Sequence, residues 1–210
     1  RVGPEHASLA HLYDNMGLAF ANQGDHERAM EHYRKALAIQ EKTLGPEHPS
    51  VGNTYLNMGE AFWRQGDYGQ TLEHYRKALA IFLNALGPEH PHVGITYMNM
   101  GTVFDAQGEY ERALGHYRKA LAIQLKELGP EHPQVGATYN NMAVVFYKQG
   151  EYERALEFYR KALPISLKAL GPEHPSVGDT YNNMGAAFKQ GDHERALEHY
   201  RKALAIYLKA

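Results

Sequence analysis

The chain repeats a single pattern with a constant step of 42 residues. The clearest marker is Gly45-Pro46-Glu47-His48, and the same four residues return beginning at Gly3, Gly87, Gly129 and Gly171. Self-similarity at such a period indicates a stack of supersecondary units, none of which can bury its apolar face alone. Five units account for all 210 residues. We therefore predict one repeat array over residues 1–210, divided into repeats 1–44, 45–86, 87–128, 129–170 and 171–210.

The second repeat shows the first of two helical patterns. Over residues 49–65, Val51, Tyr55, Met58 and Phe62 recur at spacings of 4, 3 and 4. That is the period of a helix with one buried stripe. The preceding Gly-Pro ends one helix, and the proline after the histidine suits the first turn of the next.

A second helical pattern follows over residues 67–86, where Leu72, Tyr75, Ala78 and Ile81 form a broad apolar face. The carboxylate at the start of this segment suits a helix N-terminus. Two helices joined by a short turn form an antiparallel hairpin. The sequence thus predicts an all-α fold of five hairpins and ten helices.

Two small residues lie beside the buried stripe of the first helix. They are Gly52 and Gly59, and only Ala10 and Ala143 replace them in other repeats. Glycine inside a helix costs roughly 1 kcal/mol against alanine. Its recurrence predicts that another helix approaches closely here.

The pattern resembles a known family of repeats. Residues 54–62 (Thr-Tyr-Leu-Asn-Met-Gly-Glu-Ala-Phe) and 65–68 (Gln-Gly-Asp-Tyr), followed by Tyr75 and Ala78, resemble the tetratricopeptide repeat, and the likeness extends over the whole chain. The usual period of that repeat is 34 residues, so the period of 42 is closer to that of kinesin light chains. The resemblance implies a right-handed α-solenoid in which the first helices line a concave groove that binds peptides or partner proteins.

Five columns of the first helix change freely between repeats; in the second repeat they are Asn53, Leu56, Glu60, Trp63 and Arg64. They fall within an arc of roughly 100° opposite the apolar stripe. The sequence of any solvent-exposed face can vary between repeats, yet the solvent-exposed columns of the second helix barely change. Variation confined to one face is typical of a tailored contact surface, so we predict that these columns form the binding groove.

One column at the edge of that arc does not vary. It consists of Asn15, Asn57, Asn99, Asn141 and Asn183. Such amides, each with a donor and an acceptor, suit a clamp on the main chain of an extended peptide, as in kinesin light chains. Equally, they suit hydrogen bonds between adjacent repeats. On the variable face, Trp63 and Tyr147 are the expected aromatic anchors.

The predicted groove residues combine these two sets. They are His11, Asp14, Asn15, Leu18, Asn22, Asn53, Leu56, Asn57, Glu60, Trp63, Arg64, Met98, Asn99, Thr102, Asp105, Asn140, Asn141, Val144, Tyr147, Lys148, Asp179, Asn182, Asn183 and Lys189.

Composition argues against several other functions. A formal net charge of -2 without a Lys/Arg cluster disfavours nucleic acid, and no apolar run reaches the length of a membrane helix. Of thirteen histidines, five belong to the Gly-Pro-Glu-His link and four to one column of the second helix. We therefore expect no metal, no cofactor and no enzyme activity. The absence of cysteine fits the cytoplasm.

Two hypotheses for the function follow. In the first, the chain is a non-catalytic scaffold that binds a peptide or partner protein in the groove. In the alternative, it is a structural spacer or sensor arm of a larger signalling protein, without a dedicated groove ligand.

Two local departures from the repeat, and the position of the first residues within it, lead to further predictions. Pro164 replaces an alanine in the second helix of the fourth repeat and predicts a kink in that helix. One residue is missing after Phe188, which predicts a tighter fifth hairpin turn. Arg1-Val2 occupy the columns of the end of a preceding repeat, which indicates a piece of a longer array.

The two ends of such an array would expose apolar faces that inner repeats cover. Weak head-to-tail self-association between molecules is the expected result. The residues concerned are Leu9 and Leu12 at one end and Leu197, Tyr200, Leu204, Ile206 and Leu208 at the other.

Overall fold

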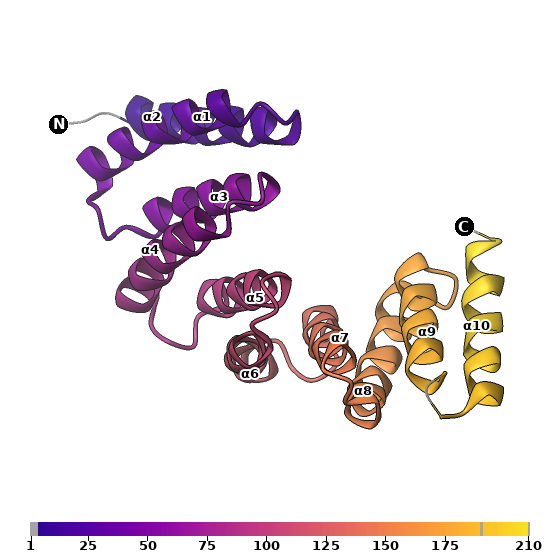
Figure 1. Ribbon diagram of the computed structural model, residues 1–210. Coiled ribbons are helices and arrows are strands. Elements are labelled where there is room, and N and C mark those ends of the chain that lie inside the picture. The colour runs from indigo at the N-terminus through magenta and orange to yellow at the C-terminus, as the bar shows by residue number, and fades with distance from the viewer. Residues whose placement is uncertain (1–3, 190, 210) are drawn as a thin grey trace. The chain divides into compact units, whose positions relative to one another are not determined.

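The computed structural model describes residues 4–189 and 191–209, and within these residues every element is an α-helix (Figure 1). The predicted all-α fold is confirmed. Arg1-Val2, Gln190 and Ala210, on which the predictions about the ends and the fifth turn partly rest, lie outside the described residues. The helices are α1 (Pro4–Asn22), α2 (His26–Leu44), α3 (Pro49–Arg64), α4 (Tyr68–Leu86), α5 (Pro91–Ala106), α6 (Tyr110–Glu127), α7 (Pro133–Lys148), α8 (Tyr152–Leu170), α9 (Pro175–Phe188) and α10 (His193–Tyr207).

Consecutive helices pack as hairpins, namely α1 with α2, α3 with α4, α7 with α8, and α9 with α10 (Figure 1). Successive hairpins meet where α2 contacts α3, α6 contacts α7 and α8 contacts α9. The chain divides into two compact units, Arg1–Val103 and Phe104–Ala210, and the boundary falls within α5.

The Gly-Pro-Glu-His link both ends one helix and starts the next. Gly45 has φ +91°, a left-handed conformation that glycine adopts without strain. The ring Nδ1 of His48 then accepts a hydrogen bond from the backbone N–H of Ser50 at 3.2 Å, which caps α3, and Pro49 occupies its first turn. The same histidine cap recurs at α5, α7 and α9. These histidines are therefore structural.

Glycines of the first helices make room for aromatic rings of the second helices. A Cβ built at Gly59 would lie 2.5 Å from a ring carbon of the buried Tyr75, and one at Gly17 would lie 2.6 Å from Tyr33. Both distances are shorter than any real contact. The predicted close approach of a helix at the small columns is confirmed, and it comes from the helix's own hairpin partner.

The two interior departures behave differently. In the fifth turn, the backbone N–H of Asp192 bonds to the carbonyl of Phe188, four residues earlier, at 2.7 Å, whereas that of Glu151 reaches Phe146, five residues earlier. The tighter turn is confirmed. By contrast, α8 runs as one helix through Pro164, and the kink there stays a prediction.

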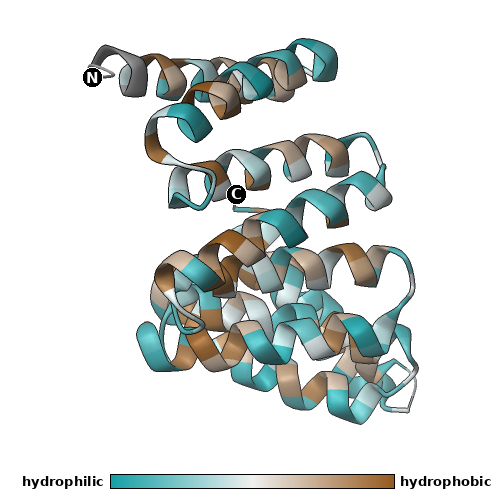
Figure 2. Cartoon of the chain, turned by 90° about the vertical axis from the view of Figure 1, so that its left-hand side faces the viewer, coloured by the Kyte–Doolittle hydropathy of each residue, from teal (hydrophilic) through white to brown (hydrophobic). Residues whose placement is uncertain are grey.

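Hydropathy varies around each helix, so brown and teal segments alternate along the ribbons (Figure 2). Side chains in columns that are buried within inner repeats are exposed on α1 and α10. Leu12 is 53% exposed and Leu197 is 54% exposed, whereas their counterparts Thr54 and Leu156 are buried. Ile206 is a correction to the predicted terminal face, because it is buried like Ile123 in the same column of α6. Among the described helices, none combines the length and the apolar character needed to cross a membrane.

Candidate functional site

The predicted groove residues lie on the sides of α1, α3 and most of α5 in the first unit, and of the end of α5, α7 and α9 in the second, with Lys189 directly after α9. Every one of them is exposed or half-buried. On the opposite side of α3, Val51 and Met58 are buried, and Tyr55 and Phe62 pack half-buried against the same core. We call the variable columns of the first helices, which in α3 are Asn53, Leu56, Glu60, Trp63 and Arg64, the variable stripe.

The five asparagines beside the variable stripe form the asparagine row: Asn15, Asn57, Asn99, Asn141 and Asn183. Asn15 is exposed and the others are half-buried. Within the part of the chain that the structure describes, none of these side-chain amides has a hydrogen-bond partner. The interpretation that they tie adjacent repeats together therefore finds no bond to support it.

Several charged side chains of the variable stripe pair with one another. The guanidinium of Arg64 donates to Oδ1 of Asn22 at 2.8 Å, from one repeat to the preceding one, and to Glu60 at 3.3 Å. In the second unit, the Lys148 ammonium lies 2.8 Å from the carboxylate of Asp105. Exposed pairs of this kind contribute at most about 1 kcal/mol each. They order the surface of the stripe more than they stabilise the fold.

Both predicted anchors rest on another aromatic ring. The ring of Trp63 lies 5.3 Å from that of Tyr68, and the ring of Tyr147 lies 5.5 Å from that of Tyr152. Each anchor is half-buried, so part of each ring faces solvent. A small recess of about 60 Å³ beside Trp63 is lined by Glu60, Trp63, Tyr75, Asn99 and Thr102.

One variable column also affects the core. Glu60 accepts a hydrogen bond from the hydroxyl of the buried Tyr75 at 3.3 Å. In the first repeat Leu18 takes the place of Glu60, and the hydroxyl of Tyr33 is buried without a hydrogen-bond partner among residues 4–189 and 191–209. Burial raises the pKa of Tyr33 to about 12. Substitution along the stripe therefore changes the hydrogen bonding beneath it.

Asp14 belongs to a polar cluster that joins the first two repeats. The side-chain amide of Gln40 on α2 donates to the Asp14 carboxylate at 2.8 Å. The hydroxyl of Thr54 on α3 lies 2.8 Å from the same carboxylate and 2.9 Å from Oε1 of Gln40. Burial raises the pKa of Asp14 above its ordinary 3.8, although the hydrogen bonds from Thr54 and Gln40 act to lower it. Sequence reasoning missed Gln40 and Thr54.

Two clefts occupy equivalent places in the two units. The first, between α1, α2 and α3, measures about 260 Å³ and contains Asp14 and Gln40. The second, between α7, α8 and α9, measures about 350 Å³ and has Asn140 and Ser166 at the corresponding positions. Among the described residues, Oδ1 of Asn140 is buried without a hydrogen-bond partner. The change from Gln40 to Ser166 on the second helix was visible in the sequence, but only as one column among many.

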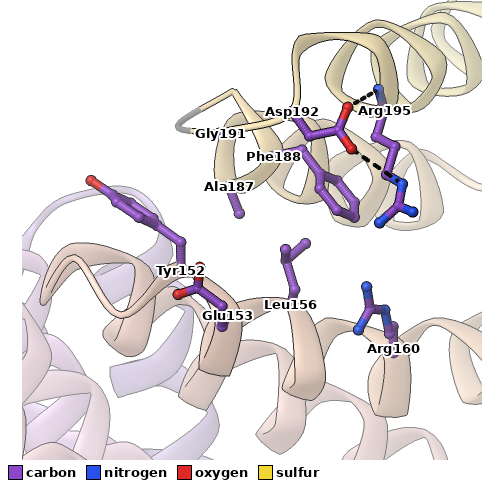
Figure 3. A pocket seen from close by; sticks show the side chains of 9 residues that line it. All are labelled: Tyr152, Glu153, Leu156, Arg160, Ala187, Phe188, Gly191, Asp192 and Arg195. Carbon is purple, nitrogen blue, oxygen red and sulfur yellow. Dashed lines mark hydrogen bonds and ion pairs between the residues drawn. The ribbon is translucent and has the colours of Figure 1, made fainter.

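Another hollow, of about 550 Å³, lies where α8 faces the turn between α9 and α10 (Figure 3). Leu156 and Phe188 form its apolar floor. Asp192 accepts from the backbone N–H of Arg195 at 3.0 Å and pairs with its guanidinium at 3.3 Å. These groups satisfy one another as the cap of α10. None of the residues that line the hollow belongs to the predicted groove residues, and the column of Arg160 is arginine in every repeat.

Most remaining histidines have structural contacts. Nδ1 of His32, His74 and His199 lies 2.8 Å from the carbonyl four residues earlier in each case, and the rings lie 5.0 Å from Phe20, Phe62 and Phe188. Burial lowers the pKa of His74. Among residues 4–189 and 191–209, no three His, Asp or Glu side chains gather as they would to bind a metal ion.

Comparison with known proteins agrees with this geometry. The tetratricopeptide repeat family matches four overlapping segments, residues 7–84, 50–126, 107–168 and 134–209. None of the curated proteins matches the chain.

Three solved structures illustrate the likeness. BtubC (BKLC) from P. vanneervenii has 25% identity and a TM-score of 0.88, over 97% of this chain and 82% of its own. A Podosopora anserina protein described as a kinesin light chain with nearly identical TPR-like repeats has 26% identity and a TM-score of 0.81, over 99% and 98%. Aspartyl phosphate phosphatase F from Bacillus subtilis, at 19% identity and a TM-score of 0.81 over 95% and 51%, shares the fold alone.

Proposed function

The chain belongs to the tetratricopeptide repeat family, and from this we propose that it is a non-catalytic scaffold that holds a peptide segment of a partner protein against the variable stripe. Members of this family typically bind proteins. The family alone does not identify the residues that contact a partner, so the assignment rests on the two faces of the first helices.

The asparagine row carries the proposal. Five identical amides lie beside the most variable surface of the chain, and no internal hydrogen bond of the described residues accounts for them. An amide offers one donor group and one acceptor, which is what the main chain of an extended peptide requires. The asparagine of every repeat would contact the main chain of the peptide, while the variable columns would determine which peptide side chains bind.

Aromatic side chains supply the anchoring contacts in this proposal. Trp63 in the first unit and Tyr147 in the second present partly exposed rings that are held in place by Tyr68 and Tyr152. Rings already fixed by a neighbour lose little conformational entropy on binding. Aromatic residues of this kind dominate interface energetics.

One observation favours the alternative, a structural spacer or sensor arm without a groove ligand. Arg64 with Asn22, and Lys148 with Asp105, bridge adjacent first helices within each unit. Such bridges would serve to stiffen an array. A spacer would gain nothing from the asparagine row, and this difference separates the two proposals.

Peptide display against the whole chain tests them. We expect reproducible enrichment of one motif, and a strong loss of binding in the double variant Asn57→Ala/Asn141→Ala. The matched control is Lys77→Ala/Lys161→Ala, which changes equivalent exposed positions on the second helices. Absence of any enriched motif, or equal loss in the control, would support the spacer.

We also propose head-to-tail self-association through the apolar faces of α1 and α10. Leu9 and Leu12 on α1 are 40% and 53% exposed, and Leu197 and Leu204 on α10 are 54% and 56% exposed. Inside the array such surfaces cover each other between repeats, so a second copy has the complementary shape. The sedimentation coefficient should rise with concentration, and Leu197→Glu/Leu204→Glu should abolish the rise. A concentration-independent monomer would contradict the proposal.

A cytoplasmic location is proposed on one ground. The sequence contains no cysteine, so the fold needs no oxidising compartment. Cell fractionation with an antibody against the chain would test it.

A further inference from the structure

The cleft between α7, α8 and α9 differs from its counterpart in the first unit in four of the columns that line both, where Ala137, Asn140, Ser166 and Asp179 replace His11, Asp14, Gln40 and Asn53. At the first cleft, Gln40 reaches from α2 between α1 and α3 and bonds to Asp14. At the second, the same column holds Ser166. Serine is too short to repeat that bond, and the cleft measures about 350 Å³ where the first measures about 260 Å³.

Polar groups at the second cleft show the effect of that loss. Thr180 donates to the carbonyl of Ser176 in its own helix, at 3.0 Å. Oδ1 of Asn140, in the column of Asp14, is buried and has no hydrogen-bond partner in the part of the chain that the structure describes. A buried acceptor without a donor is unfavourable, so this amide gains from any donor that enters the cleft. In the complex, the amide would turn about its terminal torsion, which is broad, to bring its oxygen to a donor in the cleft.

The walls and the charge of the cleft define the entering group. Ala137, Ala169 and Leu170 supply apolar surface, which suits an aliphatic stem. Asp179 is exposed at the rim and accepts from the hydroxyl of Tyr207 at 2.7 Å. Among the described residues that line the cleft, Asp179 is the one charged side chain. The preferred occupant is therefore a cation on an apolar stem.

We propose that the cleft between α7, α8 and α9 is a specificity subsite that takes an arginine side chain of the bound partner. The planar guanidinium has five donors and can serve both Asn140 and Asp179. The stem then packs against Ala137 and Leu170, and the charge stays near the rim, where water limits its desolvation. This subsite rests on the proposed function of the groove, and it adds the chemistry of one partner residue.

Blocked amino acids test the subsite without a peptide. The probes are N-acetyl-arginine methylamide, its neutral isostere N-acetyl-citrulline methylamide, and N-acetyl-norleucine methylamide. Nuclear magnetic resonance spectra of the whole chain would follow the side-chain amide of Asn140 and the backbone of α7 to α9. We expect arginine to bind about tenfold more tightly than citrulline, as a charge-assisted bond predicts, with no response to norleucine.

Variants then decide whether the cleft is responsible. Ser166→Gln restores the glutamine of the first junction and should abolish the arginine response. Ser166→Ala, the matched control, leaves the cleft open and should retain it. Asp179→Asn changes an exposed residue and should reduce arginine affinity about tenfold, which keeps the test decisive if Ser166→Gln does not fold.

The outcomes separate this subsite from the groove as a whole. Equal responses of the wild type and Ser166→Gln, or equal binding of norleucine and arginine, would overturn the subsite. Peptides enriched without arginine and unaffected by Ser166→Gln would do the same while leaving the groove intact. Arginine bound at the cleft with no peptide enriched would uphold the subsite and reject the groove.

Discussion

The junction of α1, α2 and α3 and the junction of α7, α8 and α9 are built on the same backbone pattern and both contain a cleft, but among the described residues only the first is bridged by hydrogen bonds between side chains of its two repeats. Gln40, Asp14 and Thr54 satisfy one another in the first. In the second, Oδ1 of Asn140 is buried without a hydrogen-bond partner among the described residues, and Ser166 stands in the column of Gln40. Near-identical repeats therefore differ in hydrogen bonding at their junctions through a few columns of side chains.

The two junctions should also differ in how their stability responds to substitution and to a bound ligand. A closed polar cluster contributes to stability only while every member is paired. An open one contributes less, and it can gain from a ligand. The first junction should thus be sensitive to substitution, and the second should tolerate it.

Removing the glutamine should have the largest effect. Gln40→Ser leaves the half-buried Asp14 carboxylate without its amide donor, and we expect a loss of about 2 kcal/mol in the free energy of unfolding. Trp63 is the chain's one tryptophan and lies in the first unit, so its fluorescence during urea unfolding reports this junction. Ser166→Ala is the matched control and should cost less than about 0.5 kcal/mol. Equal effects would mean that the junctions do not differ as described.

Replacing the buried threonines should separate the junctions again, with a smaller effect. Thr54→Val removes the hydroxyl next to Asp14 and Gln40 and should cost about 1 to 2 kcal/mol. Thr180→Val removes only a bond to its own helix and should cost under about 0.5 kcal/mol. Hydrogen exchange of α3 and α9 amides would measure both. A greater loss for Thr180→Val would contradict the comparison.

Closing the second junction should stabilise it slightly. Ser166→Gln supplies a donor to Asn140 and an acceptor to Thr180, as Gln40 does in the first unit, and we expect a gain of about 0.5 to 1 kcal/mol. Hydrogen exchange across α7 to α9 is the measurement, and Ser166→Met, of similar length without hydrogen-bonding groups, is the control. A gain as large in the methionine variant would assign the effect to packing alone.

The smallest expected effect is a pH dependence confined to the first junction. The pKa of Asp14 is raised in the folded state, so folding favours the protonated carboxyl. This contribution to stability is fully present below the unfolded pKa, near 3.8, and falls as pH rises through the higher folded value. Asp14→Asn, the residue found at position 140, should remove this term. The wild-type stability minus that of the variant should decline over that window; a rise with pH would show that the hydrogen bonds outweigh burial.

Local signals were sufficient to predict the helices and their turns. Gly45 with its positive φ, Pro49 in the first turn and the capping His48 act within a few residues of one another. The small residues at Gly52 and Gly59 likewise indicated a close approach that the rings of Phe82 and Tyr75 provide. Interactions that depend on neighbours in the chain can be read from the chain.

The groove residues could be predicted as a face but not in their contacts. Periodicity placed Trp63 and Glu60 on one side of α3, yet only the packed structure pairs Trp63 with Tyr68 and Glu60 with Tyr75. Asp14 was expected to face a ligand, and it is held by Gln40 and Thr54. These partners come from other helices, so no spacing along one helix indicates them.

The repeat sequence alone was enough to predict an all-α fold of ten helices, because each turn and cap is made by residues adjacent in sequence. Whether side chains bond across a junction depended on the tertiary structure. Gln40 is 26 residues from Asp14 along the chain, and Ser166 is equally far from Asn140. Their relation becomes visible only when α2 is packed beside α1 and α3, and α8 beside α7 and α9, because burial and hydrogen bonding depend on what surrounds a side chain in space.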